Sequence, residues 1–288
     1  MAATTSTNTT TRRRLVASPG AWLVWAAVAF FLLNLAGVVG SVLVSSFGTR
    51  WFDSWFPEGF TGEWYGAAWK EFGLLDVISV TLQISLLVVL ISVLIGVPAA
   101  YVLARRTFPF KRLVMFAFLL PILMPPITYG IPLATVLYKF GLAPGIAGVV
   151  LSNLVPSVPF VILTMTPFIE QINPSIESAA RMCGAGVRAL FLRVLGPLLV
   201  PGILAAAILV LVRTVGMFEL TFLTAGPDSQ TLVVALYYSM SAAGIRAQQS
   251  IDAMAVIYTS TMLVLLVIAL RFVNPTQLVA RVKETPEP

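Results

Sequence analysis

Long stretches without any charge most limit what this chain can fold into. Charge-free gaps separate Arg14 from Arg50, Asp76 from Arg105, Arg112 from Lys139, Lys139 from Glu170 and Arg193 from Arg213, with a shorter one from Asp252 to Arg271. Each gap holds the roughly 20 apolar residues that a helix needs to cross a bilayer. The sequence therefore predicts an all-α membrane protein with six transmembrane helices, at about 22–44, 77–104, 113–137, 149–169, 198–223 and 252–271.

The distribution of lysine and arginine predicts the orientation. In a six-span chain both termini lie on one side, and that side would carry Arg12, Arg13, Arg14, Arg105, Arg106, Lys111, Arg112, Arg181, Arg188, Arg193, Arg271, Arg281 and Lys283. The other side would carry only Arg50, Lys70, Lys139 and Arg246. Positively charged loops stay cytoplasmic, so both termini are expected inside. The net charge of +6 then indicates contact with membrane lipid and no nucleic-acid partner, because no basic run is interleaved with aromatics on a soluble domain.

Composition along the chain predicts three parts. Residues 1–20, rich in Thr and Ser, are expected to form a disordered cytoplasmic tail, 21–275 the six-helix domain, and 276–288 a cytoplasmic C-terminal tail. The first apolar run follows three arginines, as in a signal peptide, but it continues from Leu15 to Val44 without a clear cleavage site, which favours an uncleaved anchor.

Prolines are concentrated in the third and fourth spans. They are Pro121, Pro125, Pro126 and Pro132, followed by Pro156, Pro159 and Pro167. Each removes a helix hydrogen bond, and the freed carbonyls are tolerated in a membrane only against protein or water. Both spans are therefore expected to be interior and kinked, and Pro125 and Pro126 are candidates for lining a substrate pathway. A purely structural kink is the alternative for each proline.

Arg213 and Glu219 are the polar outliers of the fifth span. On one helix they would lie about 240° apart, so they are not expected to pair. Ionisable groups within a span usually face a cavity or another helix. Arg213 is therefore expected either to line a pathway or to bridge to a partner subunit. Glu219 is a second pathway candidate, with an ordinary position at the outer interface as its alternative.

The residues needed for catalysis are absent. The chain has no His, and its one thiol, Cys183, has no base partner, which excludes Ser–His and Cys–His catalysis. No GxxxxGK[ST] phosphate loop occurs, and a single Cys excludes a multi-cysteine metal site. The chain is therefore expected to be no enzyme, to have no catalytic residue, and to bind no metal or cofactor of its own.

The segment at about 171–197 is unusual because it neither spans nor catalyses. Asn173 and Pro174 predict a helix start, with Asn as the N-cap and Pro at the first position. That helix can run to Cys183 and break at Gly184. A second short helix, from about Val187 to Val194, is expected to end at Gly196-Pro197. Exposed Met182, Leu190 and Phe191 among arginines would form a protein interface, whereas an amphipathic loop lying on lipid is the alternative.

"ESAARMCGAGVRALFLRVLGPLLVP" (177–201) resembles the cytoplasmic loop of the permease subunits of binding-protein-dependent type I ABC importers. The positions that keep the spacing of the family pattern are Ala179, Ala180, Gly184, Val194 and Pro197. Ser178 stands where the family has Glu, and Gly196 where it has Leu. Glu177, one residue earlier, can partly replace the missing carboxylate. "GVPAAYVLARR" (96–106), "LLPILMPPITYGIPL" (119–133) and "FLTAGPDSQTLVVALYYSM" (222–240) extend the resemblance from about Trp64 to Arg271.

The resemblance implies a permease of the bacterial cytoplasmic membrane that works in a complex. Its expected partners are a second permease subunit, two cytoplasmic ATPases that bind ATP and Mg, and an extracytoplasmic binding protein. The loop would be a coupling helix seated in a groove of an ATPase. The residues that it assigns to coupling are Glu177, Ser178, Ala179, Ala180, Met182, Gly184, Leu190, Phe191 and Pro197.

The resemblance is strongest to the polyamine branch, and sugar permeases are second. The proline-rich third span and the pair Trp64-Tyr65 carry the first likeness, and Glu219 and Asp228 would suit a cationic solute. Two other kinds of membrane protein, a secondary transporter and an intramembrane enzyme, lack support in the sequence. A secondary transporter would need coupling carboxylates or half-helices near the midplane, and an intramembrane enzyme would need His, paired Asp or a metal cluster.

Overall fold

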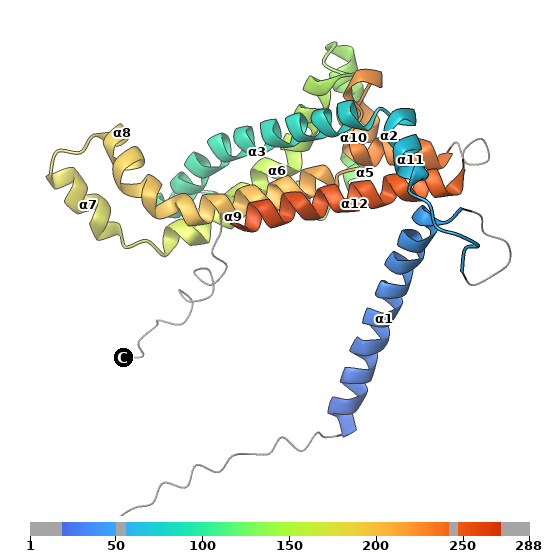
Figure 1. The fold of residues 1–288 in the computed structure, drawn as a ribbon. Coiled ribbons are helices and arrows are strands. Elements are labelled where there is room, and N and C mark those ends of the chain that lie inside the picture. The colour runs from blue at the N-terminus through green and yellow to red at the C-terminus, as the bar shows by residue number, and fades with distance from the viewer. Residues whose placement is uncertain (1–18, 50–55, 242–246, 272–288) are drawn as a thin grey trace, which may run out of the picture.

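The computed structural model describes residues 19–49, 56–241 and 247–271, and these residues form a helical molecule (Figure 1). The predicted tails lie outside them, apart from Pro19 and Gly20, which begin the first helix. The helices are α1 (Pro19–Phe47), α2 (Glu63–Glu71), α3 (Leu74–Arg105), α4 (Lys111–Leu123), α5 (Pro126–Lys139), α6 (Ile146–Glu170), α7 (Pro174–Met182), α8 (Val187–Ala189), α9 (Gly196–Val215), α10 (Glu219–Thr224), α11 (Leu232–Ser241) and α12 (Gln248–Arg271), with a π-helix at Leu190–Leu195 and a 3-10 turn at Pro227–Ser229.

The core of the molecule lies between α3, α6 and α9, and α6 is the most buried candidate span. Helices α3 and α6 approach closely at Gly96, where an added Cβ would lie only 2.7 Å from Val161 Cγ1. The fourth span is interior, as predicted, with Pro156 and Pro159 both buried. It nevertheless remains one helix, without a break at any of its prolines.

The third span is broken in two. Helices α4 and α5 meet at Met124-Pro125 and are bent by 96°. Met124 is extended, with φ −78° and ψ 141°, as expected for a residue that precedes a proline. The predicted kink is therefore confirmed. The predicted interior position is wrong for the first half, because α4 has no buried residue in this chain.

The fifth span differs from its prediction at both ends. At its start the chain does not stop at Gly196-Pro197 but stays helical from Val187 to Val215, passing through the π-helix. There the Gly196 N–H reaches back to the Phe191 carbonyl, and Pro197 lies in the first turn of α9, where the ring is tolerated. At its far end α9 stops at Val215 and α10 begins at Glu219, so the 240° estimate for Arg213 and Glu219 on one helix does not apply.

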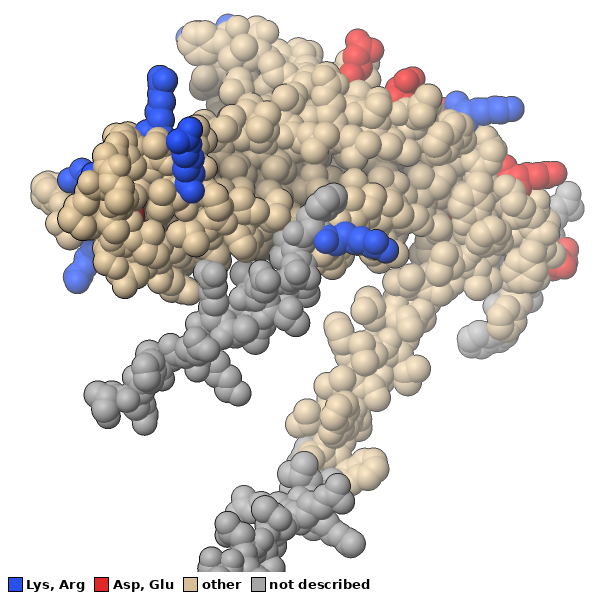
Figure 2. Space-filling model, turned by 60° about the vertical axis from the view of Figure 1, so that its left-hand side comes forward, with Lys and Arg blue, Asp and Glu red and all other residues tan. Residues whose placement is uncertain are grey.

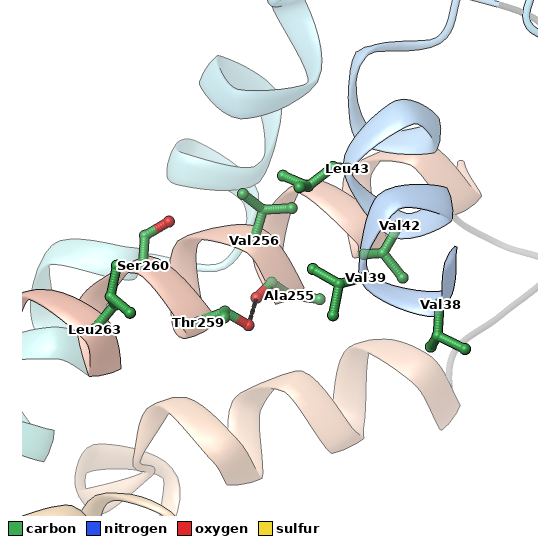
Figure 3. Close-up of a pocket in the computed structure, with 9 residues that line it drawn as sticks. All are labelled: Val38, Val39, Val42, Leu43, Ala255, Val256, Thr259, Ser260 and Leu263. Atoms are coloured by element: carbon green, nitrogen blue, oxygen red, sulfur yellow. Dashed lines mark hydrogen bonds between the residues drawn. The ribbon is translucent and has the colours of Figure 1, made fainter. Parts of the chain in front are cut away.

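Helix α1 diverges from the bundle (Figure 1). Near its C-terminal end the Ser45 hydroxyl donates to Asp252 Oδ2 of α12 at 2.5 Å, but none of its most apolar window is buried. The two helices enclose an apolar cleft of about 350 Å³ (Figure 3). Its lining is Val38, Val39, Val42, Leu43, Ala255, Val256, Thr259, Ser260 and Leu263. Among the residues that the structure describes, no charged side chain lines this cleft.

Charge is distributed unevenly along the bundle. In Figure 2 basic side chains gather around the end that carries α7 and α8, and acidic side chains lie toward the opposite end. Five described helices are long and apolar enough to cross a membrane, or six if the bent pair α4–α5 counts as one span. The all-α architecture and the number of spans therefore agree with the prediction.

Candidate functional site

Helix α7 begins as its sequence predicts. The Asn173 side chain accepts a hydrogen bond from the Ser175 N–H at 2.9 Å, and Pro174 is the first residue of the helix. The helix ends at Met182, and Gly184 has φ 81°, a left-handed conformation that favours glycine. Gly184 therefore provides the predicted break within the loop.

The outer face of the loop is both apolar and basic. Met182 is 84% exposed, and Val187 and Leu192, which the sequence analysis did not single out, are 73% and 77% exposed. Among the predicted coupling residues and the arginines of the loop, Ser178, Ala179, Arg181, Gly184, Arg188, Arg193 and Pro197 are also exposed, and Ala180 is half-buried. The exposure expected for Leu190 is wrong. Leu190 is 2% exposed and packs into the main core, and Phe191 is half-buried, because the helical continuation into α9 turns both toward the bundle.

The inner face of α7 carries Glu177, which is buried. Its Oε1 lies 2.6 Å from Arg105 Nε, and its Oε2 accepts a hydrogen bond from the Tyr101 hydroxyl at 2.6 Å. Arg105 Nη2 also donates to the Ile172 carbonyl at 2.7 Å. Glu177 thus faces α3. Glu177 does not lie on the exposed face of the loop. A carboxylate that replaces the family glutamate, which is missing at Ser178, would have to lie on that face.

The pathway candidates belong to α9, which carries Arg213, to α10, which begins with Glu219, and to the start of α5 at Pro125-Pro126. The Arg213 guanidinium lies 5.8 Å from the centre of the Phe160 ring, within reach of a cation–π interaction. Helix α10, which begins with Glu219, is fixed to α6 by the hydrogen bond from Asn153 Nδ2 to Thr221 Oγ1 at 3.3 Å. No ion pair joins Arg213 to Glu219 among the described residues.

Helix α5 brings the prolines into the same region. Pro125 and Pro126 form the bend at its start, and Tyr129 follows on its first turn. The Tyr129 hydroxyl is buried and has no hydrogen-bond partner among the described residues. Helix α5 also packs against α10, because an added Cβ on Gly130 would lie 2.9 Å from Leu220 Cδ2. The structure thus places Pro125 and Pro126 at the start of a helix that contacts α10, whose first residue is Glu219.

An aromatic cluster lies beside this region. Phe218, Phe222, Tyr237 and Tyr238 have ring centres 4.9 to 6.0 Å apart. Tyr237 and Tyr238 are 44% and 46% exposed, so their rings remain accessible in this chain. The pattern of aromatics at 218, 222, 237 and 238 was present in the sequence, but only the turn at Pro227–Ser229 brings the two pairs together.

The described residues form a bundle of helices that are long and apolar enough to cross a membrane, with an exposed helical loop at its basic end. The family described as "Binding-protein-dependent transport system inner membrane component" matches residues 92–277, and the chain belongs to this family. The match contains the whole loop and α9. The predicted identity as an ABC importer permease and the predicted location in the inner membrane are therefore confirmed.

Individual relatives transport different solutes. The chain is 36% identical over 132 residues to the trehalose transport permease SugB of Mycobacterium tuberculosis, covering 46% of this chain and about half (48%) of that protein. It is 30% identical over 191 residues to the molybdenum transport permease ModB of Haemophilus influenzae, covering 60% of this chain and 83% of ModB. A bacterial alginate ABC importer has the same fold, with a TM-score of 0.67 at 18% identity, covering 91% of this chain and 95% of that chain.

Proposed function

We propose that this chain is a non-catalytic permease subunit of an ATP-driven importer. It forms the translocation pathway with a second permease subunit and couples through residues 174–197 to two cytoplasmic ATPases. ATP and Mg are bound by those ATPases, and an extracytoplasmic binding protein delivers the solute. The solved alginate importer in complex with a periplasmic binding protein supports this last partner.

The observation that carries the coupling role is the exposed face of the loop. Met182, Val187 and Leu192 are large apolar side chains, each more than 70% exposed, on a segment that also presents Arg181 and Arg188. Apolar side chains within a polar rim are typical of protein interfaces. The rest of the loop is held on the bundle by buried Leu190 and Leu195, so the exposed face is presented on a fixed base.

For the solute, we rank a carbohydrate ahead of a polyamine. The aromatic cluster of Phe218, Phe222, Tyr237 and Tyr238 offers ring faces of the kind that pack against sugar rings. Two relatives, the trehalose permease and the diacetylchitobiose permease NgcG of Streptomyces coelicolor, carry sugars. The polyamine alternative is based on the resemblance of the proline-rich third span and of Trp64-Tyr65, with Glu219 and Asp228 as carboxylates for a cationic solute. The charge of Arg213, in the span that precedes Glu219, opposes a polycation.

Site-directed crosslinking tests the coupling role. In a Cys183→Ser background, Met182→Cys should crosslink to the ATPase of the complete complex. Leu75→Cys, which is 66% exposed at the opposite end of α3, is the matched control and should not. Crosslinking from neither position, with both cysteines labelled, would contradict the proposal.

Uptake into proteoliposomes tests the solute. The complete complex with its binding protein should import a disaccharide and not spermidine or molybdate. Import of spermidine alone would reverse the ranking, and import of molybdate alone would exclude both solutes.

A further inference from the structure

The loop is attached to α3 without being connected to it along the chain. By covalent structure α7 follows α6 through residues 171–173 and leads through α8 and the π-helix to α9. An ion pair nevertheless joins α7 to α3, between Glu177 and Arg105. Figure 1 shows α7 and α8 at the end of the bundle, beyond the ends of the long helices.

Tyr101 contacts both halves of the loop. Its hydroxyl donates to Glu177 on α7, and its ring meets the Phe191 ring of the π-helix edge to face, with the ring centres 4.7 Å apart. Arg105, one helical turn further on, binds Glu177 and also the Ile172 carbonyl just before α7. Two residues of α3 therefore hold three separate points of the loop.

The surroundings make these contacts rigid. The side chains of Arg105 and Glu177 are only 12% and 9% exposed, so water and salt screen their attraction little. A carboxylate held by a guanidinium and a hydroxyl at once has little freedom to rotate. Such a pair contributes little net stability, because burying both charges is costly, but it fixes one orientation of the helices.

We propose that Tyr101, Arg105 and Glu177 form a joint through which a movement of α7 passes directly to α3. The inference rests on the proposed coupling function of the loop. Helix α3 packs closely along α6 at Gly96 and Val161, so a shift of its cytoplasmic end is transmitted into the core. The loop is connected covalently to α6 and α9 and moves them directly. Through the joint, a movement of the loop also moves α3.

Charge removal tests the joint in the complete complex. Arg105→Gln and Glu177→Gln should each reduce the stimulation of ATP hydrolysis by loaded binding protein about 5-fold or more. The matched controls are Arg106→Gln and Glu170→Gln, which neutralise exposed charges next to the joint and should keep the stimulation.

The double variant Arg105→Gln/Glu177→Gln separates a joint from a merely stabilising pair. Each single change leaves one buried charge unpaired, whereas the double change leaves none. If the pair only stabilises the fold, the double variant regains both thermal stability and stimulation, and the proposal is overturned. If the pair transmits movement, the double variant regains stability but stays uncoupled.

A distance measurement tests the movement itself. Spin labels at Ser175→Cys on α7 and Val102→Cys on α3, in a Cys183→Ser background, should keep one separation with and without trapped ATP. In the double Gln variant that separation should change or broaden on trapping. A separation that changes equally in both proteins would overturn the joint. Failure of the ATPase to co-purify with the unaltered chain would instead overturn the proposed function.

Discussion

The carbonyl oxygen of Phe191 lies 2.8 Å from the point where a Cβ on Gly196 would stand. The two residues close a turn of the π-helix, in which the Gly196 N–H bonds to that same carbonyl. π turns are rare, and they are frequently found at functional sites within helices. The glycine that departs from the leucine of the family pattern is therefore the residue that this turn accommodates.

Gly196→Leu should destabilise the protein although it restores the family residue. Its Cβ meets backbone, which cannot move aside as a side chain does, and a cost of about 1–3 kcal/mol is expected. Thermal unfolding in detergent, followed by size-exclusion chromatography, measures this. Gly186→Leu is the control, because that position has φ −70° and open space around it. Equal midpoints for the two variants would contradict the prediction.

Gly184→Arg should leave the protein inserted but weaken its association with the ATPase. The residue has φ 81° and no neighbour within 4 Å, so the change adds bulk and charge to the proposed docking face. Co-purification of the ATPase measures the effect. Gly73→Arg is the control, since Gly73 also has positive φ, at 55°, and open space, but precedes α3 at the other end. Backbone strain of about 1–3 kcal/mol is common to both. If the two variants lose the ATPase to the same extent, the defect is due to backbone strain and not to the docking face.

Gly96→Ala should loosen the contact between α3 and α6. The new methyl group would lie 2.7 Å from Val161 Cγ1, and overpacking of this kind costs about 1–3 kcal/mol. A lower midpoint of thermal unfolding is expected. Adding Val161→Ala removes the nearer colliding atom, Cγ1, while Val161 Cβ stays 2.8 Å away. Gly96→Ala should therefore cost less in the Val161→Ala background than in the unaltered chain, which is a partial recovery. The absence of any such recovery would mean that the helices do not meet at this point.

Arg213→Met should reduce uptake while the protein remains assembled. Removal of the charge changes the polarity beside the Phe160 ring, and methionine keeps an unbranched side chain at this position. Phe160→Leu keeps the charge and removes only the ring beneath it, a contact of about 0.5–2 kcal/mol, so its effect on uptake should be smaller. Initial uptake rates per assembled complex measure both. Normal uptake by Arg213→Met would remove Arg213 from the pathway and favour its bridging to the partner subunit.

Two positions report the topology of α9 and α10. Cys183, which is exposed, should react with an impermeant thiol reagent only from the cytoplasm. Asp228→Cys, in a Cys183→Ser background, should react only from outside. Ser229, one residue later, is 2% exposed and is unsuitable for labelling. Labelling of both positions from one side would contradict the predicted orientation.

Much of the fold follows from local sequence. The charge-free gaps predict the long helices, and Asn173-Pro174 predicts the start of α7, because these signals depend only on hydrophobicity and on neighbouring residues. The break at Met124-Pro125 was likewise visible as a run of prolines. These features can be predicted without knowing which helices contact one another.

The errors have a common physical origin in contacts between distant segments. Leu190 was expected outside because an apolar residue among arginines is typical of an interface, but the direction it faces depends on α9 continuing through Pro197. Glu177 was expected to face a partner because it lies next to the position of the family's missing carboxylate, and no local sequence signal pairs it with Arg105, 72 residues earlier. Tyr129 was missed for the same reason, since the burial of its hydroxyl depends on how α5 packs against later segments of the chain.

The divergence of α1 affects how genetic variation in this chain should be read. Phe30 and Leu33 are 72% and 73% exposed on a helix whose most apolar window is not buried by the rest of the described residues. Exchange of one apolar side chain for another at these positions leaves the internal packing of the described bundle unchanged. A variant there that impairs transport therefore acts through contacts with lipid or with another polypeptide. A variant at Gly96 with the same defect acts through packing within the chain itself.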